Sequence, residues 1–83
     1  MVLFLTKTFQ KNFQKLPKAI QTKVENSLRK IHLDPYKKRK LLGELEGEFS
    51  YRLGKYRIIY FIDKEKNILI ETVRPRKDVY RKK

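Results

Sequence analysis

The chain contains 83 residues, of which 40% are hydrophobic and 37% are charged. This length and composition predict one small folded domain over residues 1–83, with too much apolar material for a disordered tail. The absence of cysteine excludes a disulfide framework and any thiolate metal site. No apolar run approaches the roughly 20 residues that a membrane-spanning helix needs, so we expect a cytoplasmic protein with no membrane partner.

The net charge is the first functional indication. Lysine and arginine total 22 against 9 aspartate and glutamate residues, which gives a formal charge of +13. The basic excess is present both in residues 1–35 and in residues 36–83, so it is not confined to a tail. A field of this sign attracts polyanions and speeds their association. A lysine-rich, solubilising surface of the kind found in heat-adapted proteins is the alternative.

The first half of the chain has the pattern of a strand followed by a helical hairpin. Residues 2–6 are rich in strand-forming side chains. Two apolar stripes at helical spacing follow, and a Leu-Pro-Lys break at 16–18 suits the end of one helix and the start of the next. The stripes consist of Phe9, Phe13 and Leu16, then Ile20, Val24, Leu28 and Ile31. Residues 8–33 are therefore expected to form two helices with one buried side.

The second half changes to strand periodicity after a connecting segment at 36–47. That segment holds the basic run Lys37, Lys38, Arg39 and Lys40. Beyond it, turn signals at 54–55 and 63–67 separate three expected strands, at 49–53, 56–62 and 68–73. The middle strand is nearly all β-branched or aromatic, as expected of a central strand covered on both sides.

The order of strand, helix, helix and three strands predicts an α+β fold. The helical hairpin is expected to pack on one face of a small twisted antiparallel sheet. The first strand must join that sheet by pairing with one of the later strands, and the pattern leaves its partner open.

Several catalytic schemes find no support in the sequence. The single histidine, His32, falls near the end of the second helix, where a surface residue is expected. Glu44, Glu46 and Glu48 alternate around two glycines with no fourth ligand, so we interpret them as solvated charges or as partners for nearby lysines. We therefore expect neither a metal nor a cofactor.

The remaining candidate catalytic residues are a set of cationic side chains and one tyrosine. Its members are Arg52, Lys55, Arg57, Arg74, Arg76, Lys77, Tyr80 and Arg81. RNA cleavage without metal needs a proton removed from the 2′-hydroxyl, a stabilised phosphorane and a protonated leaving oxygen. Arginines can clamp the phosphate, and a tyrosine or lysine beside other cations can move protons. A basic surface that only binds nucleic acid fits the same composition.

Two motifs resemble those of the RelE/ParE toxin family. Residues 45–60 contain Leu-Glu-Gly, an aromatic-arginine strand, a short turn and then Tyr-Arg-Ile-Ile-Tyr. Residues 73–81 resemble the family's closing pattern, often Gly-His-Arg-x-x-Val-Tyr, with Arg74-Pro75 in place of Gly-His. The element order and the Leu-Pro-Lys break also match, so the resemblance covers the whole chain.

The RelE branch of this family implies a type II toxin that cuts mRNA in the ribosomal A site by 2′-hydroxyl attack and so inhibits translation. On this resemblance, Arg57 stabilises the transition state. Arg52 and Lys55 match the basic strand and turn, and would orient or activate the 2′-hydroxyl. Arg76 matches the closing-motif arginine. Arg74 matches it instead if the alignment gap between this motif and the family pattern is placed differently.

The resemblance gives the remaining residues of the set lesser or alternative roles. Tyr80 matches the family's terminal tyrosine, a candidate base or a platform on which a nucleobase stacks. Arg57 could instead pair with an acid such as Glu71. We interpret three other tyrosines, Tyr51, Tyr56 and Tyr60, as sheet and core residues. The cations expected to bind RNA are Arg74, Lys77, Arg81, Lys37, Lys38, Arg39 and Lys40.

The resemblance also implies partners. They are mRNA and the ribosome, a cognate acidic or amphipathic antitoxin that covers the basic cleft, and promoter DNA bound through the antitoxin complex. Two alternatives stay open: the ParE branch, which poisons DNA gyrase, and an inactive homologue that only binds nucleic acid or an antitoxin. Ribosome-dependent cleavage distinguishes the RelE function from both alternatives, and gyrase-dependent DNA breaks identify the ParE function.

Overall fold

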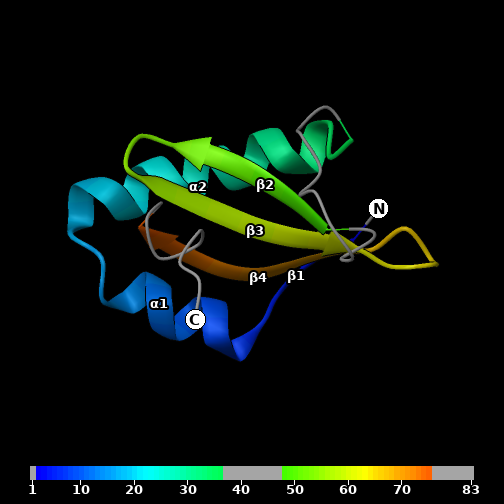
Figure 1. Ribbon diagram of the computed structural model, residues 1–83, viewed down its shortest axis with the longest axis horizontal. Helices are drawn as coiled ribbons and strands as arrows, with labels where there is room; N and C mark the ends of the chain where they lie inside the picture. Colours follow the sequence, from blue (N-terminus) through cyan, green and yellow to red (C-terminus); the bar gives the residue numbers. More distant parts are fainter. Residues whose placement is uncertain (1, 37–47, 76–83) are drawn as a thin grey trace, which may run out of the picture.

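Six elements make up the computed structural model, which describes residues 2–36 and 48–75. They are β1 (Leu3–Leu5), α1 (Lys7–Gln14), α2 (Lys18–Leu33), β2 (Glu48–Leu53), β3 (Tyr56–Ile62) and β4 (Ile68–Pro75). This is the element order that the sequence predicts, and Figure 1 shows how the three long strands form a twisted meander. The α+β fold is therefore confirmed.

The helical hairpin forms where the two apolar stripes and the proline break place it. Thr6 caps α1, because its Oγ1 accepts a hydrogen bond from the backbone N–H of Phe9 at 3.1 Å. Pro17 occupies the N-cap position of α2, where a residue without an N–H costs the helix nothing. The chain thus ends one helix and starts another within a few residues.

The sheet has the strand order β1-β4-β3-β2, and one of its pairings differs from the prediction. β2, β3 and β4 are antiparallel neighbours, as expected, but β1 runs parallel to β4, with Leu3 beside Ile68 and Leu5 beside Ile70. The sheet is therefore mixed. A three-residue strand carries no signal of direction in its sequence. Two backbone hydrogen bonds flank its ladder with β4: Thr6 N–H to Ile70 O at 3.1 Å and Ile68 N–H to Val2 O at 2.7 Å.

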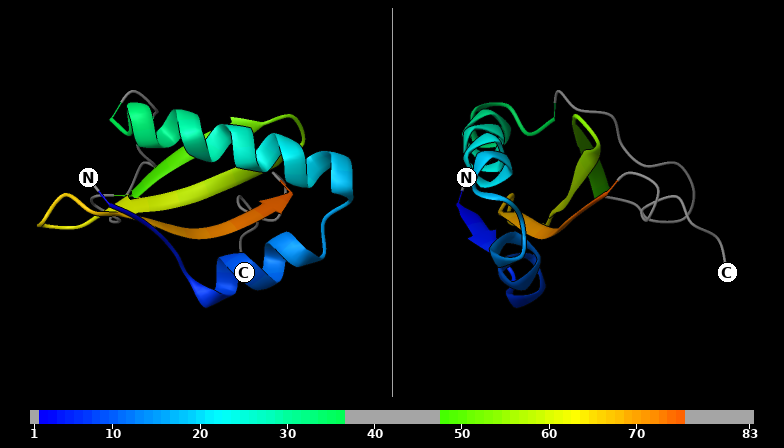
Figure 2. Two further views of the ribbon diagram at one scale, coloured as in Figure 1. Left: turned by 180° about the vertical axis from the view of Figure 1, so that it is seen from behind. Right: turned by 90° about the vertical axis from the view of Figure 1, so that its left-hand side faces the viewer.

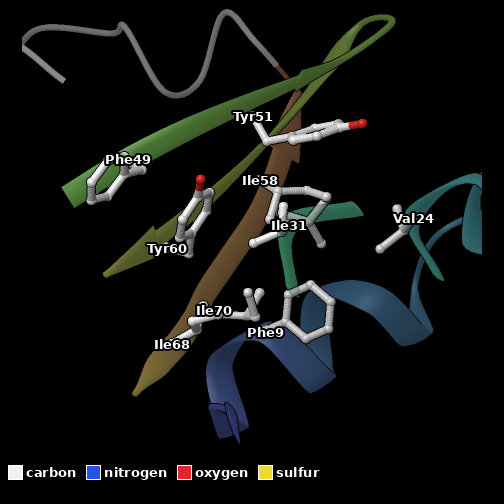
Figure 3. Packing of buried hydrophobic residues seen from close by; sticks show 10 residues of the cluster. Phe9, Val24, Ile31, Phe49, Tyr51, Ile58, Tyr60, Ile68 and Ile70 are labelled. Atoms are coloured by element: carbon white, nitrogen blue, oxygen red, sulfur yellow. The ribbon is translucent and has the colours of Figure 1, made fainter. Parts of the chain in front are cut away.

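The core lies between the helices and one face of the sheet. Figure 3 shows α1 and α2 side chains meeting the inward residues of the strands. Tyr60 stacks on Phe49 with ring centroids 5.3 Å apart and donates a hydrogen bond from its hydroxyl to Pro35 O at 2.6 Å. The buried hydrophobic residues of this cluster are Phe9, Val24, Ile31, Phe49, Tyr51, Ile58, Tyr60, Ile68, Ile70 and Val73. Tyr56 packs against it, which confirms the structural interpretation of all three tyrosines.

Both helices lie on the same side of the sheet, as the end-on view in Figure 2 shows. Among the described residues, α1 and α2 cover one face of the central strand β3, and the sequence predicts that both faces are covered. Ile59, on the other face, is also buried. We call the side opposite the helices the distal face. Its residues on β2, β3 and β4 include Glu48, Ser50, Arg52, Arg57, Ile59 and Arg74, which alternate with the core residues.

Candidate functional site

Three arginines stand in one row across the distal face. Arg57 on β3 is the register partner of Arg52 on β2 and also of Arg74 on β4. Directly opposed residues in antiparallel strands have Cα atoms only about 4.5–5.5 Å apart. The neighbours of these arginines on the strands, Tyr51, Ile58 and Val73, point into the core, so all three guanidinium groups lie on the same side. The fold thus brings together three of the cations that the sequence singles out.

The arginine row, defined as Arg52, Arg57 and Arg74, is electrostatically unfavourable for an isolated chain. Like charges placed directly opposite each other destabilise a sheet by about 0.2–1 kcal/mol per pair. Arginine cannot relieve the repulsion by losing its proton. Arg52 and Arg74 are exposed while Arg57 is partly buried between them. A phosphate bound over the row would offset the repulsion, because guanidinium groups bind phosphate oxygens bidentately.

Arg57 is anchored to the neighbouring strand by a hydroxyl. Its Nη1 donates a hydrogen bond of 2.5 Å to Oγ of Ser50, which lies two residues before Arg52 on the same face of β2. Only 5% of Ser50 is exposed. The sequence analysis named Glu71 as an alternative partner for Arg57. The carboxyl group of Glu71 is hydrogen-bonded to the carboxyl group of Glu48.

Glu48 and Glu71 lie on the same side of the sheet as the arginine row. Glu48 is partly buried beside Glu71, so it is not the solvated charge that the sequence suggested. Glu48 begins β2, and Glu71 is the extra residue of a β-bulge, since Ile59 pairs with Thr72 but Tyr60 pairs with Ile70. Burial, the hydrogen bond to Glu71 and the charge of Glu71 raise the pKa of Glu48 from 4.5 to about 7. Glu48 therefore changes charge near neutral pH.

The other residues expected at the site are not in the row. Lys55 occupies the turn between β2 and β3, where it lines a groove of about 270 Å³ with Ile20 and Lys23 of α2. Gly54 supplies the positive φ of 58° that this two-residue turn requires. His32 is exposed in the last turn of α2, as expected. Arg76, Lys77, Tyr80, Arg81, Lys37, Lys38, Arg39, Lys40, Glu44 and Glu46 lie outside the described residues.

One functional candidate, Ser50, is absent from the set that the sequence suggested, and Glu71 was named there only as a possible partner for Arg57. The alternation of β2 places Ser50 on the face of Arg52, which was the available signal. Glu71 reaches Glu48 through a bulge that has no signature in the sequence. Among residues 2–36 and 48–75, no group of three or more histidine, aspartate or glutamate side chains is arranged to hold a metal ion.

Removing one flanking charge is expected to stabilise the fold while weakening RNA binding. Arg74→Gln relieves repulsion in the row, so the free energy of unfolding should rise by about 0.5 kcal/mol at low salt. Urea denaturation measures this gain, which should shrink as added salt screens the charges. Affinity for a short RNA should fall in the same variant. Lys64→Gln, in the exposed turn after β3, is the matched control. A loss of stability in Arg74→Gln would contradict the repulsion.

The architecture defines the class of protein. A strand, a helical hairpin and a three-strand meander in a four-stranded mixed sheet form the fold of the RelE toxins. The M. tuberculosis toxin–antitoxin complex RelBE2 contains a chain 32% identical to this one, with a TM-score of 0.78 over 89% of this chain and 95% of that chain. The archaeal RelE–RelB complex from Pyrococcus horikoshii gives 29% identity and a TM-score of 0.72 over 90% and 93%.

The sequence agrees with the structural comparison. Residues 3–80 match the family described as the ParE toxin of the type II toxin–antitoxin system parDE. The chain therefore belongs to the RelE/ParE superfamily of type II toxins. The intact E. coli RelBE complex shares the fold, at 18% identity and a TM-score of 0.78 over 89% of this chain and 94% of that chain. A comparison with functionally curated proteins found no match. Neither described helix is long and apolar enough to cross a membrane.

Proposed function

We propose that this toxin is an mRNA endonuclease that acts on the translating ribosome in the cytoplasm and inhibits translation. The arginine row is the observation that carries the proposal, because it places three permanent charges where one RNA backbone can contact all of them. Phosphates along a nucleic-acid strand attract such a row, and the formal charge of +13 adds attraction at longer range.

The proposed reaction is attack of a ribose 2′-hydroxyl on the adjacent phosphate, with no metal required. The 2′-oxygen forms a bond to phosphorus as its proton leaves, and the bond from phosphorus to the 5′-oxygen breaks as that oxygen gains a proton. Arg57 would neutralise the charge that develops on the phosphorane, and Arg52 would hold the substrate beside it. The proposed proton carriers are Lys55 and Tyr80, and Arg76 is a second phosphate ligand.

An antitoxin is the expected protein partner. The relatives from M. tuberculosis and P. horikoshii were each crystallised as a complex of toxin and antitoxin. For this chain we propose an acidic or amphipathic antitoxin that covers the arginine row, since opposite charge would relieve the repulsion there. The complex would bind its promoter DNA through the antitoxin.

The description of the matching family favours one competing function. That family is named for ParE, and ParE toxins poison DNA gyrase rather than cut RNA. An inactive homologue that only binds nucleic acid or an antitoxin is the third reading. These readings differ in which macromolecule is damaged, which makes them separable in one experiment.

The test adds the purified chain to a reconstituted translation system and, in parallel, to gyrase with supercoiled plasmid. mRNA ends are mapped by primer extension. We expect cuts at codons held in the ribosome, intact DNA, and loss of the cuts in Arg57→Ala and Arg76→Ala. DNA breaks with intact mRNA would assign the ParE function. Folded protein that damages neither would leave only the binding role.

RNA binding is expected to weaken as pH rises through neutrality. Glu48 has a pKa of about 7, so it becomes charged between about pH 6 and pH 8 and adds a negative charge to the face that carries Arg57. Within residues 2–36 and 48–75, the other charged groups on this face are Glu71, Arg52 and Arg74. One added charge about 7–10 Å from a phosphate in water changes affinity roughly two- to threefold. Fluorescence anisotropy with an uncleavable RNA should show this loss in the wild type.

The same titration affects stability, and Glu48→Gln tests both effects. The folded-state pKa of Glu48 lies above its ordinary value of 4.5, so the native chain binds more protons between about pH 4.5 and 7. The free energy of unfolding contributed by this group therefore falls as pH rises through that window. Glu48→Gln should flatten both pH profiles. Unchanged profiles in the variant would assign the pH dependence to another group.

A further inference from the structure

Ser50 is a buried polar side chain at the centre of β2, between the Glu48–Glu71 pair and Arg52. Its neighbours on the strand, Phe49 and Tyr51, belong to the core. Ser50 itself is 5% exposed on the distal face, and its Oγ accepts the 2.5 Å hydrogen bond from Arg57. A buried strand position favours a β-branched or aromatic residue, so a serine here indicates that its hydroxyl makes a specific polar interaction.

The hydrogen bond opposes a force that the arginine row creates. Arg52 and Arg74 flank Arg57 on both sides, and their charges push its guanidinium away from the row. A long, flexible side chain also loses several rotamers when it is fixed in one position. The bond to Ser50 sets the plane of the guanidinium and so the direction of its other N–H groups, because the group is rigid and flat.

A hydroxyl suits this position better than an acid would. A carboxylate would pair with Arg57 and cancel the charge that a phosphate must meet. Serine accepts a hydrogen bond from Arg57 and, being uncharged, adds no negative charge of its own. The Ser50 hydroxyl therefore orients the guanidinium without itself neutralising it, which suits a group that stabilises developing negative charge.

We propose that Ser50 is a positioning residue that holds the Arg57 guanidinium in the orientation required for phosphate recognition in the transition state. The proposal rests on the proposed RNA cleavage for its kinetic consequence. Its structural part, the orientation of Arg57, stands on the contact between these two side chains alone.

The kinetic test is single-turnover mRNA cleavage by Ser50→Ala. A misplaced catalytic group costs up to about 10²-fold in rate, so we expect a loss of roughly 10- to 100-fold. RNA affinity should change by less than about twofold, because the charge of Arg57 remains. Ser50→Thr keeps the hydroxyl and should restore most of the rate. Thr72→Val removes a different hydroxyl, one that bonds to Asn12 of α1, and should leave the rate unchanged.

A second measurement separates this proposal from the proposed function. NMR of the arginine side chains reports rotation about the Nε–Cζ bond of Arg57. Rotation should be slow in the wild type and in Ser50→Thr, and faster in Ser50→Ala. If the wild type cuts no RNA, the proposed function fails, and this measurement alone decides the role of Ser50. Equal rotation in all three proteins, or full cleavage by Ser50→Ala, would overturn the proposal.

Discussion

Replacing Arg57 with alanine is expected to lower the rate of mRNA cleavage by about 10²–10³-fold, the usual cost of removing a preorganised donor to a developing charge. Arg57 is the middle member of the arginine row, and its guanidinium donates a hydrogen bond to Ser50. Arg57→Lys keeps the charge but loses the planar fork, and should retain only part of the activity. Single-turnover rates in the translation system measure both.

The matched control for Arg57→Ala removes the same charge from elsewhere. Arg29 lies on α2, exposed, with a hydrogen bond of 2.7 Å to Asn26. Arg29→Ala changes the net charge equally and should leave the cleavage rate within about twofold, since surface substitutions away from the site have small effects. Equal losses in Arg29→Ala and Arg57→Ala would show that total charge, and not the row, governs activity.

Tyr60, although it closes the Tyr-Arg-Ile-Ile-Tyr motif, is expected to act on stability alone. Its side chain is fully buried, stacked on Phe49, and hydrogen-bonded to Pro35. Burial, and then the charges of Asp34 and Tyr51, raise the pKa of Tyr60 well above its usual range, so it remains a hydroxyl donor. Tyr60→Phe leaves the Pro35 carbonyl unsatisfied, which should cost about 1–2 kcal/mol of unfolding free energy.

The larger truncation Tyr60→Ala should cost about 3–5 kcal/mol, because it also opens a cavity in the core. A domain of this size has a total stability of roughly 4–12 kcal/mol, at about 0.05–0.15 kcal/mol per residue, so this variant is expected to be marginally folded. Urea denaturation followed by circular dichroism gives both values. Tyr60→Phe should cleave mRNA at the wild-type rate. Normal stability with lost cleavage would move Tyr60 into the reaction.

Most of the fold was predictable because its signals are local. The helical periodicity from Phe9 to Ile31 and the proline break define the hairpin, and the alternating residues of β2 define which side faces the core. The parallel pairing of β1 was not predictable, since it depends on contacts between residues more than sixty positions apart. Ile59 is buried on the face of β3 away from the helices, which agrees with the continuous apolar run that predicted burial on both faces of this strand.

Part of the site was predictable because it, too, depends on local signals in the sequence. A two-residue turn at 54–55 fixes the register of β2 and β3, and so places Arg52 opposite Arg57. Arg74 joins the row only because the bulge at Glu71 shifts the register of β4 by one residue. Without the bulge, Arg74 would face the helices. The Glu48–Glu71 contact depends on the same irregularity, which no periodicity reveals.

The chemistry of the cut ends tests the central claim most directly. mRNA recovered from the translation system is labelled at its new ends and analysed by mass. Attack by the 2′-hydroxyl predicts a 5′-hydroxyl on one fragment and a 2′,3′-cyclic phosphate on the other, and no cut where the attacking ribose is replaced by deoxyribose. Fragments with 5′-phosphate ends, or cleavage that survives the 2′-deoxy substitution, would contradict the mechanism.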